Sequence, residues 1–173
     1  MELIRATVQE LKAAEELYRN IIAKTADLNQ FARWQWNLHP SEEMIEEYVR
    51  TDVMYLFMDG GKTAGAMAVT MAQGSDYHGV AWAVPAADDE TAVIHILGVA
   101  PEYQGRGIGK QMIDQAMELA RASGKKALRL DTLASNTPAQ HLYQEKGFTY
   151  RGKRNLYAGN TGWTDFFFYE YAL

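Results

Sequence analysis

A glycine-rich segment in the middle of the chain has the residue types and spacing of an anion-binding turn. It follows an apolar run over 93–99, precedes a run with apolar residues at helical spacing, and reads Gln104-Gly105-Arg106-Gly107-Ile108-Gly109-Lys110. Where a strand turns into a helix, unpaired backbone N–H groups and the helix dipole attract an anion, and glycine lets a ligand approach the backbone closely. The segment therefore predicts a phosphate-binding site.

Three known phosphate-binding patterns can be compared with this segment. A P-loop needs an early glycine and a Ser or Thr after the lysine, but Gln104 and Gln111 occupy those places. A dinucleotide-binding turn needs G-x-G-x-x-G, but Lys110 stands where the third glycine belongs. The segment fits Q/R-x-x-G-x-G/A instead, and N-x-x-A-x-x-x-Y-x-x-x-G-F follows over Asn136 to Phe148. Together the two patterns resemble the signatures of the GNAT acetyltransferase family, while a P-loop-like nucleotide binder stays open as an alternative.

The resemblance implies a fold and a cosubstrate. The expected fold is α/β (α+β), one domain over 1–173, with a mixed, mostly antiparallel twisted sheet of about seven strands flanked by about four helices. The expected cosubstrate is acetyl-CoA, with no metal, and the expected reaction is direct attack of an amine on the thioester. The residues expected to bind the coenzyme are Leu97, Gly98, Val99, Gln104, Gly105, Arg106, Gly107, Ile108, Gly109, Lys110, Asn136, Ala139 and Tyr143.

The family also implies how the thioester is held. Its strand at 91–99 diverges from the strand at 128–133, and the pantetheine arm pairs with the exposed backbone between them. A backbone N–H of Leu97 or Gly98 would then contact the thioester oxygen and stabilise the oxyanion. Gly98 would suit either a bulge that opens the sheet or close packing against a helix.

Two side chains are expected to move protons. The family resemblance makes Tyr143 the donor to the departing thiolate, and a phenol is protonated at neutral pH. His95 is the first candidate to take a proton from the amine, and strand alternation would place it on one face with Val93, Leu97 and Val99. A core role for His95 stays open, and the weaker candidates for the base are His78, Glu90 and Asp131.

The acceptor is expected to be a small primary amine. Aromatic residues in irregular segments can line a pocket for an amine or cover the sheet, and they are Trp34, Trp36, Tyr77 and Trp82. The net charge of −5 and acidic residues near 76–90 would attract a cation. Two alternatives remain: a protein N-terminus or lysine as acceptor, and a CoA-binding sensor without turnover.

Composition excludes several other classes. The chain has 17 Lys and Arg residues against 22 Asp and Glu residues, so it cannot form a broad basic face for nucleic acid. It has no cysteine, so disulfides and thiolate sites are ruled out. No signal peptide or apolar run of membrane length is visible, so a cytoplasmic protein with no membrane partner is expected. The run Phe166 to Tyr171 is too apolar for an exposed edge strand and therefore indicates a homodimer contact.

Regular elements alternate around these residues. Strands are predicted over 3–6, 54–58, 63–71, 91–99, 128–133, 148–157 and 163–172. Helices are predicted over 8–24, from Ser41 onward, over 108–123 and over 136–147. Thr7 with Glu10, Ser41 and Asn136 supply the expected helix starts.

Overall fold

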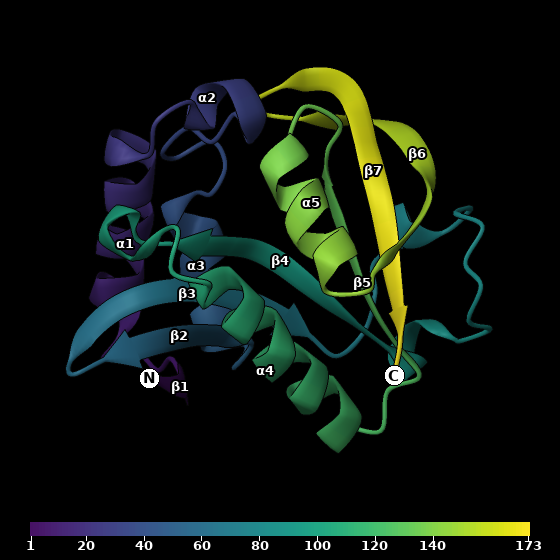
Figure 1. Cartoon of the computed structure of the whole chain (residues 1–173), viewed down its shortest axis with the longest axis horizontal. Helices are drawn as coiled ribbons and strands as arrows, with labels where there is room; N and C mark the ends of the chain where they lie inside the picture. Colours follow the sequence, from purple (N-terminus) through teal and green to yellow (C-terminus); the bar gives the residue numbers. More distant parts are fainter.

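Seven strands form one sheet in the order β1-β2-β3-β4-β5-β7-β6 (Figure 1). The computed structural model describes every residue from Met1 to Leu173. Neighbouring strands are antiparallel except β4 and β5, which run parallel. The strands are β1 (Glu2–Arg5), β2 (Met54–Asp59), β3 (Lys62–Thr70), β4 (Thr91–Val99), β5 (Ala127–Leu133), β6 (Thr149–Ala158) and β7 (Gly162–Ala172). The mixed, mostly antiparallel sheet predicted from the sequence is confirmed.

Helices cover both faces of the sheet. They are α1 (Leu11–Lys24), α2 (Leu28–Phe31), α3 (Glu42–Arg50), α4 (Ile108–Ala122) and α5 (Thr137–Glu145), with 3-10 turns η1 (Ser75–Tyr77), η2 (Asp88–Glu90) and η3 (Pro101–Tyr103). α2 is a single turn in a segment that the sequence marks as irregular, and it raises the number of helices to five. None of the helices combines the length and apolar composition needed to cross a membrane.

The predicted helix starts form, with one shift in position. Ser41 Oγ accepts the N–H of Met44 at 3.1 Å and starts α3, as its place before an acidic first turn suggests. The N–H of Thr7 donates to Glu10 Oε2 at 2.9 Å, so the predicted pair also forms. However, these residues make a separate turn, and α1 begins at Leu11 rather than near residue 8.

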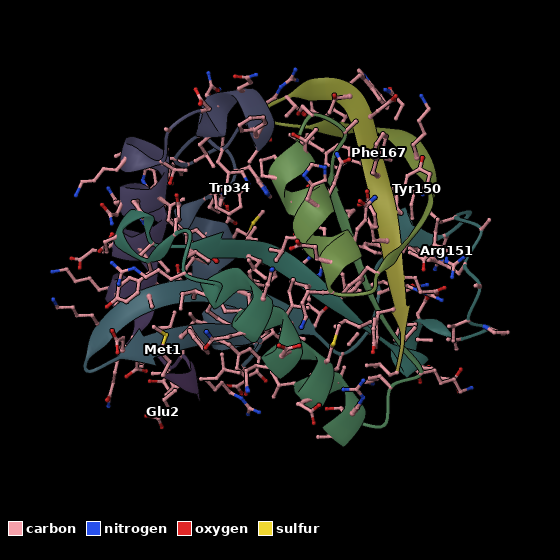
Figure 2. All side chains as sticks on the ribbon, in the orientation of Figure 1. Met1, Glu2, Trp34, Tyr150, Arg151 and Phe167 are labelled. Carbon is pink, nitrogen blue, oxygen red and sulfur yellow. The ribbon has the colours of Figure 1, made fainter.

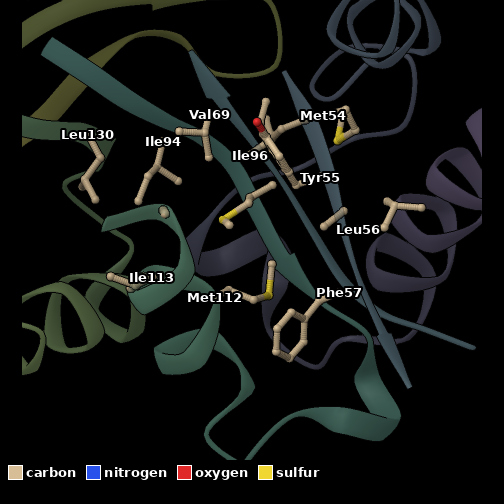
Figure 3. Close-up of a cluster of buried hydrophobic side chains, with 14 of the residues drawn as sticks. Met54, Tyr55, Leu56, Phe57, Val69, Ile94, Ile96, Met112, Ile113 and Leu130 are labelled. Atoms are coloured by element: carbon tan, nitrogen blue, oxygen red, sulfur yellow. The ribbon is translucent and has the colours of Figure 1, made fainter. Parts of the chain in front are cut away.

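A continuous apolar core joins the sheet to its helices and holds β4 in place. Figure 3 shows this cluster, to which Leu56 of β2, Val69 of β3, Ile94 of β4, Met112 of α4 and Leu130 of β5 contribute. Each of these side chains is almost completely buried. Close packing of this kind resists shifts of the strands that it contacts, so the central strands form a rigid frame.

β4 and β5 pair over only half their length. Thr91 to Ile94 lie in register with Ala127 to Leu130, and no pair follows. In Figure 1 the two strands start together near the C-terminus and then diverge, β4 toward α1 and β5 along α5. From His95 to Val99 the edge of β4 that faces β5 therefore has no strand partner, which is the divergence expected from the sequence.

A bulge interrupts β4 just where the two strands part. Ala68 pairs with His95 but Ala66 pairs with Gly98, so Ile96 and Leu97 together face the single residue Met67. Ile96 has a φ of 43°, a left-handed conformation that is strained for a β-branched residue. The bulge therefore lies at Ile96, and Gly98 is not its source.

The bulge changes which β4 side chains share a face. Val93 and His95 pair with Thr70 and Ala68, two residues apart on β3, so they share a face as expected. Val99 pairs with Gly65, at which a methyl group would meet Met112 of α4. His95 stacks on Tyr48 of α3, on the opposite side of the sheet. The prediction that Val99 shares the face of His95 is wrong, because the extra residue shifts the alternation.

β7 is an inner strand. It pairs with β5 on one side and β6 on the other, and it is the yellow strand in Figure 1. Its apolar residues, from Phe166 to Tyr171, are explained by this central position, and the side chains of Phe168 and Tyr169 are buried within the chain. A homodimer stays a prediction, because these residues do not require a second chain to cover them.

Candidate active site

A cavity of about 610 Å³ occupies the gap between the diverging halves of β4 and β5. Such a volume is typical of small-molecule sites. Most residues predicted for the site line it, namely Trp34, His95, Leu97, Gly98, Val99, Gln104, Gly105, Gly107, Ile108, Gly109, Lys110, Asn136, Ala139 and Tyr143. The divergence of the strands therefore brings both sequence patterns to one hollow.

One end of the cavity is a cradle of backbone N–H groups at residues 105–110. None of these six groups donates to an acceptor in the protein. Gly105 and Gly107 have φ values of 74° and 76°, which turn the successive groups toward one side, and a methyl group at either glycine would meet only open space. Since the cradle also begins α4, it fits a diphosphate.

The basic side chains near the cradle have other partners. Lys110 forms an ion pair with Glu145 at 3.0 Å. The Arg106 guanidinium lies over the Tyr103 ring at 5.5 Å and does not line the cavity. Gln104 Nε2 donates to Thr25 Oγ1 at 3.0 Å and to the Val99 carbonyl at 3.1 Å, which anchors the turn to α1 and β4. The cradle thus depends on the backbone more than on side-chain charge.

The bulge in β4 is held by a buried tyrosine from α1. Tyr18 is fully buried, and its hydroxyl donates to the carbonyl of Ile96 at 2.7 Å. Because C=O and N–H point in opposite directions in a trans peptide, the N–H of Leu97 points away from α1. Gly98 allows this approach, since a methyl group there would lie 2.8 Å from Cδ1 of Ile21. Close packing against a helix is therefore the role of Gly98.

Tyr18→Phe should lower kcat about tenfold without weakening the binding of acetyl-CoA to the same extent. The Ile96 carbonyl would lose its partner, and the peptide that carries the Leu97 N–H would no longer be fixed. Steady-state kinetics with an accepted amine and calorimetric binding of acetyl-CoA measure the two effects separately. Tyr55→Phe is the matched control, because Tyr55 is also buried but its hydroxyl donates no hydrogen bond. Equal kcat losses in both variants would contradict this role for Tyr18.

Tyr143 and Asn136 line the cavity from α5. The hydroxyl of Tyr143 donates to no acceptor in the protein, and burial raises the pKa of this phenol, so it stays protonated. Packing against Phe148 and Tyr169, at ring distances of 6.1 and 6.0 Å, fixes the ring. Asn136 Oδ1 accepts the N–H of Ala139 at 3.4 Å, so the predicted cap forms and leaves the amide NH₂ free.

His95 lies at the bulge with a defined tautomer. Its Nε2 lies 3.2 Å from Thr70 Oγ1, and the Thr70 hydroxyl donates its own proton to the carbonyl of Ala72. Nε2 must therefore carry the hydrogen, which leaves Nδ1 as an acceptor. Burial lowers the pKa of His95 to about 4, so the ring is neutral at pH 7. A neutral imidazole with a free lone pair can accept a proton.

The other end of the cavity, here called the acceptor chamber, is lined by Trp34, His39, Tyr48, His95, Asp131 and Asn160. Trp34 and His39 pack edge to face at 6.3 Å, and Tyr48 stacks on His95 at 5.9 Å. Trp34, labelled in Figure 2, lies below α2 in that view. Burial lowers the pKa of His39, so this ring too is neutral at pH 7.

The tip of the β6–β7 hairpin covers the acceptor chamber. Asn160 Nδ2 donates to the carbonyl of Arg33 at 2.7 Å, and Ser135 Oγ donates to the carbonyl of Phe31 at 2.8 Å. The two bonds join the segment around α2 to the C-terminal half of the chain. Sequence reasoning missed His39, Tyr48 and Asn160. The only sequence signal for any of these three residues is the aromatic composition of the irregular segment that contains His39.

Besides Arg106, five of the candidate residues lie outside the cavity. Trp36 packs under the Arg19 guanidinium at 4.3 Å, and Trp82 stacks on Tyr77 at 5.9 Å over the sheet. Trp36, Tyr77 and Trp82 therefore cover other parts of the protein and do not line the pocket for an amine, which was the first of the two roles left open for them. His78 pairs with Asp88, and Glu90 pairs with Lys126, so neither reaches the cavity. Of the weaker base candidates only Asp131 lines it.

The chain is similar to known acetyltransferases. The model of the acetyltransferase (GNAT) family matches residues 22–148. A mycothiol acetyltransferase of Beutenbergia cavernae is 40% identical over 62 residues, which cover 36% of this chain and 21% of that protein. The chain thus spans about a fifth of the length of the first curated relatives that it matches.

Two solved structures share the whole fold. The ribosomal-protein-alanine N-acetyltransferase from Brucella melitensis superposes with a TM-score of 0.74, at 18% identity over 100% of both chains. The yncA protein from Salmonella typhimurium, solved with its cofactor acetyl-CoA, gives 0.72 at 18% identity, covering 100% of this chain and 94% of that one. With the family match over most of its length, the chain belongs to the GNAT family of acetyl-CoA-dependent acetyltransferases.

Proposed function

We propose that this acetyltransferase acetylates the primary amine of a small molecule by direct attack on the thioester of acetyl-CoA. The supporting observation is that three features adjoin one another in a single cavity. They are the free backbone N–H groups at 105–110, the unpaired edge of β4, and a covered chamber that contains a neutral imidazole. A diphosphate in the cradle would direct its pantetheine arm along that edge, as an added strand would lie.

Each step of the reaction has a group in place. The neutral amine attacks the carbonyl carbon, and the N–H of Leu97 donates to the oxyanion that forms. The nitrogen of the adduct then loses a proton to Nδ1 of His95. This order suits a base with a pKa of about 4, because the adduct nitrogen is far more acidic than the free ammonium. The C–S bond breaks, and the Tyr143 hydroxyl gives its proton to the departing thiolate.

The covered chamber favours a small acceptor over a protein. The hairpin tip is bonded to the segment around α2, so a folded partner has to displace it to reach His95. A flexible N-terminus remains the alternative acceptor, since one structural neighbour is a ribosomal-protein-alanine N-acetyltransferase. A CoA-binding sensor without turnover is the second alternative. A cytoplasmic location and a dimer stay predictions.

A panel of acceptors should identify the reaction class. Purified protein with acetyl-CoA is incubated with small amines, amino acids and short peptides, and the free thiol of CoA is measured. We expect release with small primary amines at rates at least about tenfold above the rate without acceptor. Faster release with peptides would favour the protein acceptor. Binding of acetyl-CoA without release for any acceptor would favour the sensor.

A further inference from the structure

The acceptor chamber contains one formal charge. Asp131 and Lys110 are the only acidic or strongly basic residues that line the cavity, and Lys110 lies at the cradle, paired with Glu145. The two histidines of the chamber are neutral at pH 7, because burial lowers their pKa values. Asp131 is therefore the only acidic group of the chamber, and no basic side chain lies beside it.

Asp131 is held by a hydrogen bond from behind. The hydroxyl of Tyr77 donates to Oδ1, while no other side chain donates to Oδ2. Tyr77 cannot swing away, since it is buried, stacks on Trp82 and packs edge-on against Phe168 at 5.3 Å. The indole N–H of Trp82 also donates to the Tyr77 carbonyl at 2.9 Å. The carboxylate is thus oriented before any ligand arrives.

The anchor of this assembly lies beneath Trp82. The Trp82 ring lies 4.2 Å from the guanidinium of Arg129, which is this anchor. The guanidinium donates to Glu170 Oε2 at 3.0 Å and to the Val84 carbonyl at 2.9 Å. Glu170 in turn accepts the N–H of Ala83 at 2.9 Å. This buried network fixes the 74–90 loop on the sheet, so the loop presents Tyr77 to Asp131 in one position.

Asp131 has room for a second partner, since only Oδ1 accepts a hydrogen bond from another side chain. Burial raises the pKa of Asp131, and the hydrogen bond from Tyr77 opposes this shift. Asp131 is half-buried, and a carboxylate that loses its water when a ligand binds is costly unless a cation or several donors satisfy it. Trp34 and Tyr48 line the same cavity, and their rings add aromatic surface that suits a cation. A ligand that displaces water from Asp131 is therefore bound best when it brings a positive charge.

We propose that Asp131 binds a second positive charge of the acceptor, so that the preferred acceptor is a small diamine or another amine with an additional cationic group. The bound cation differs from the attacking nitrogen, because a carboxylate stabilises the protonated form of an amine and the attacking amine must be neutral. This inference rests on the proposed function and names its substrate class. It also disfavours amino acids, because no basic side chain of the chamber would balance their carboxylate.

Three acceptors of matched length test the charge. They are 1,4-diaminobutane, n-butylamine and 4-aminobutyrate, whose second groups are positive, neutral and negative. We expect kcat/KM for the diamine to exceed that for butylamine by at least about tenfold, and the aminobutyrate to be the poorest acceptor. The variant Asp131→Asn keeps an oxygen for the Tyr77 hydroxyl. In this variant the ratio of kcat/KM for the diamine to kcat/KM for butylamine should fall toward one.

A binding measurement separates this inference from the proposed reaction. The same three compounds are titrated by calorimetry into the wild type and Asp131→Asn, each saturated with CoA. Diamine binding that weakens at least about tenfold in Asp131→Asn supports the site even where no acetyl transfer is detected, in which case the proposed function fails. Equal binding of the three compounds to the wild type, or a diamine preference that persists in Asp131→Asn, overturns the inference. The wild-type comparison does not depend on the variant's folding.

Discussion

Gly107→Asp should raise the dissociation constant for acetyl-CoA at least about 100-fold, since a carboxylate would lie in a cradle made for a diphosphate. The space for the new side chain is open, because a methyl group at Gly107 would meet no atom within 4 Å. The same openness places the carboxylate beside the free N–H groups, where it would compete with the phosphates and repel them. Calorimetric titration with acetyl-CoA measures the loss directly.

Gly107→Asn separates charge from backbone strain. Gly107 has a φ of 76°, and asparagine tolerates this left-handed conformation better than most residues while matching the shape of aspartate. The asparagine variant should lose less than about tenfold in affinity, since it adds no negative charge. Raising the salt concentration should narrow the gap between the two variants. Equal losses in both, or unchanged affinity in the aspartate variant, would refute the cradle.

Tyr143→Phe should reduce kcat about 10- to 100-fold while the affinity for acetyl-CoA changes little. The hydroxyl is the one proton donor expected at the thiolate, and general acid catalysis contributes roughly this much or more. The effect should fall short of complete loss, because a thiol with a pKa of about 8.5 is already a fair leaving group. Single-turnover kinetics with an accepted amine measure the chemical step.

Tyr169→Phe is the matched control for this effect. Tyr169 belongs to the same aromatic cluster and is buried, but it does not line the cavity. Removal of the Tyr169 hydroxyl should lower the free energy of unfolding by about as small an amount as Tyr143→Phe does. It should leave kcat within about threefold of the wild-type value. If Tyr143→Phe turned over as fast as the wild type, the proton would have to reach the thiolate from elsewhere.

The sequence predicted those parts of the site that short segments determine. The glycine turn and the Asn136 cap depend on residues only a few positions apart, so their geometry follows from local rules. All seven strands form within about two residues of their predicted bounds, because apolar runs and turn residues delimit them. The sequence order of these elements then brings the two family patterns to one gap.

The acceptor chamber could not be predicted in the same way. His39, Tyr48 and Asp131 come from three distant segments, and only the tertiary fold brings them to one wall. The bulge at Ile96 has no local signal, since a β-branched residue disfavours a positive φ; Tyr18, 78 residues away, holds it there. A prediction that alternates the side chains of β4 between the two faces of the sheet is therefore wrong beyond Ile96.

The insertion of β7 between β5 and β6 has a consequence for how the chain assembles. β6 pairs with β7 and no other strand, so residues 149–158 have no partner until residues 162–172 are synthesised. β7 also carries Phe166, which lines the cavity, and Glu170, which anchors the loop that carries Tyr77. During synthesis, therefore, no finished pocket can form before residues 162–172 are added.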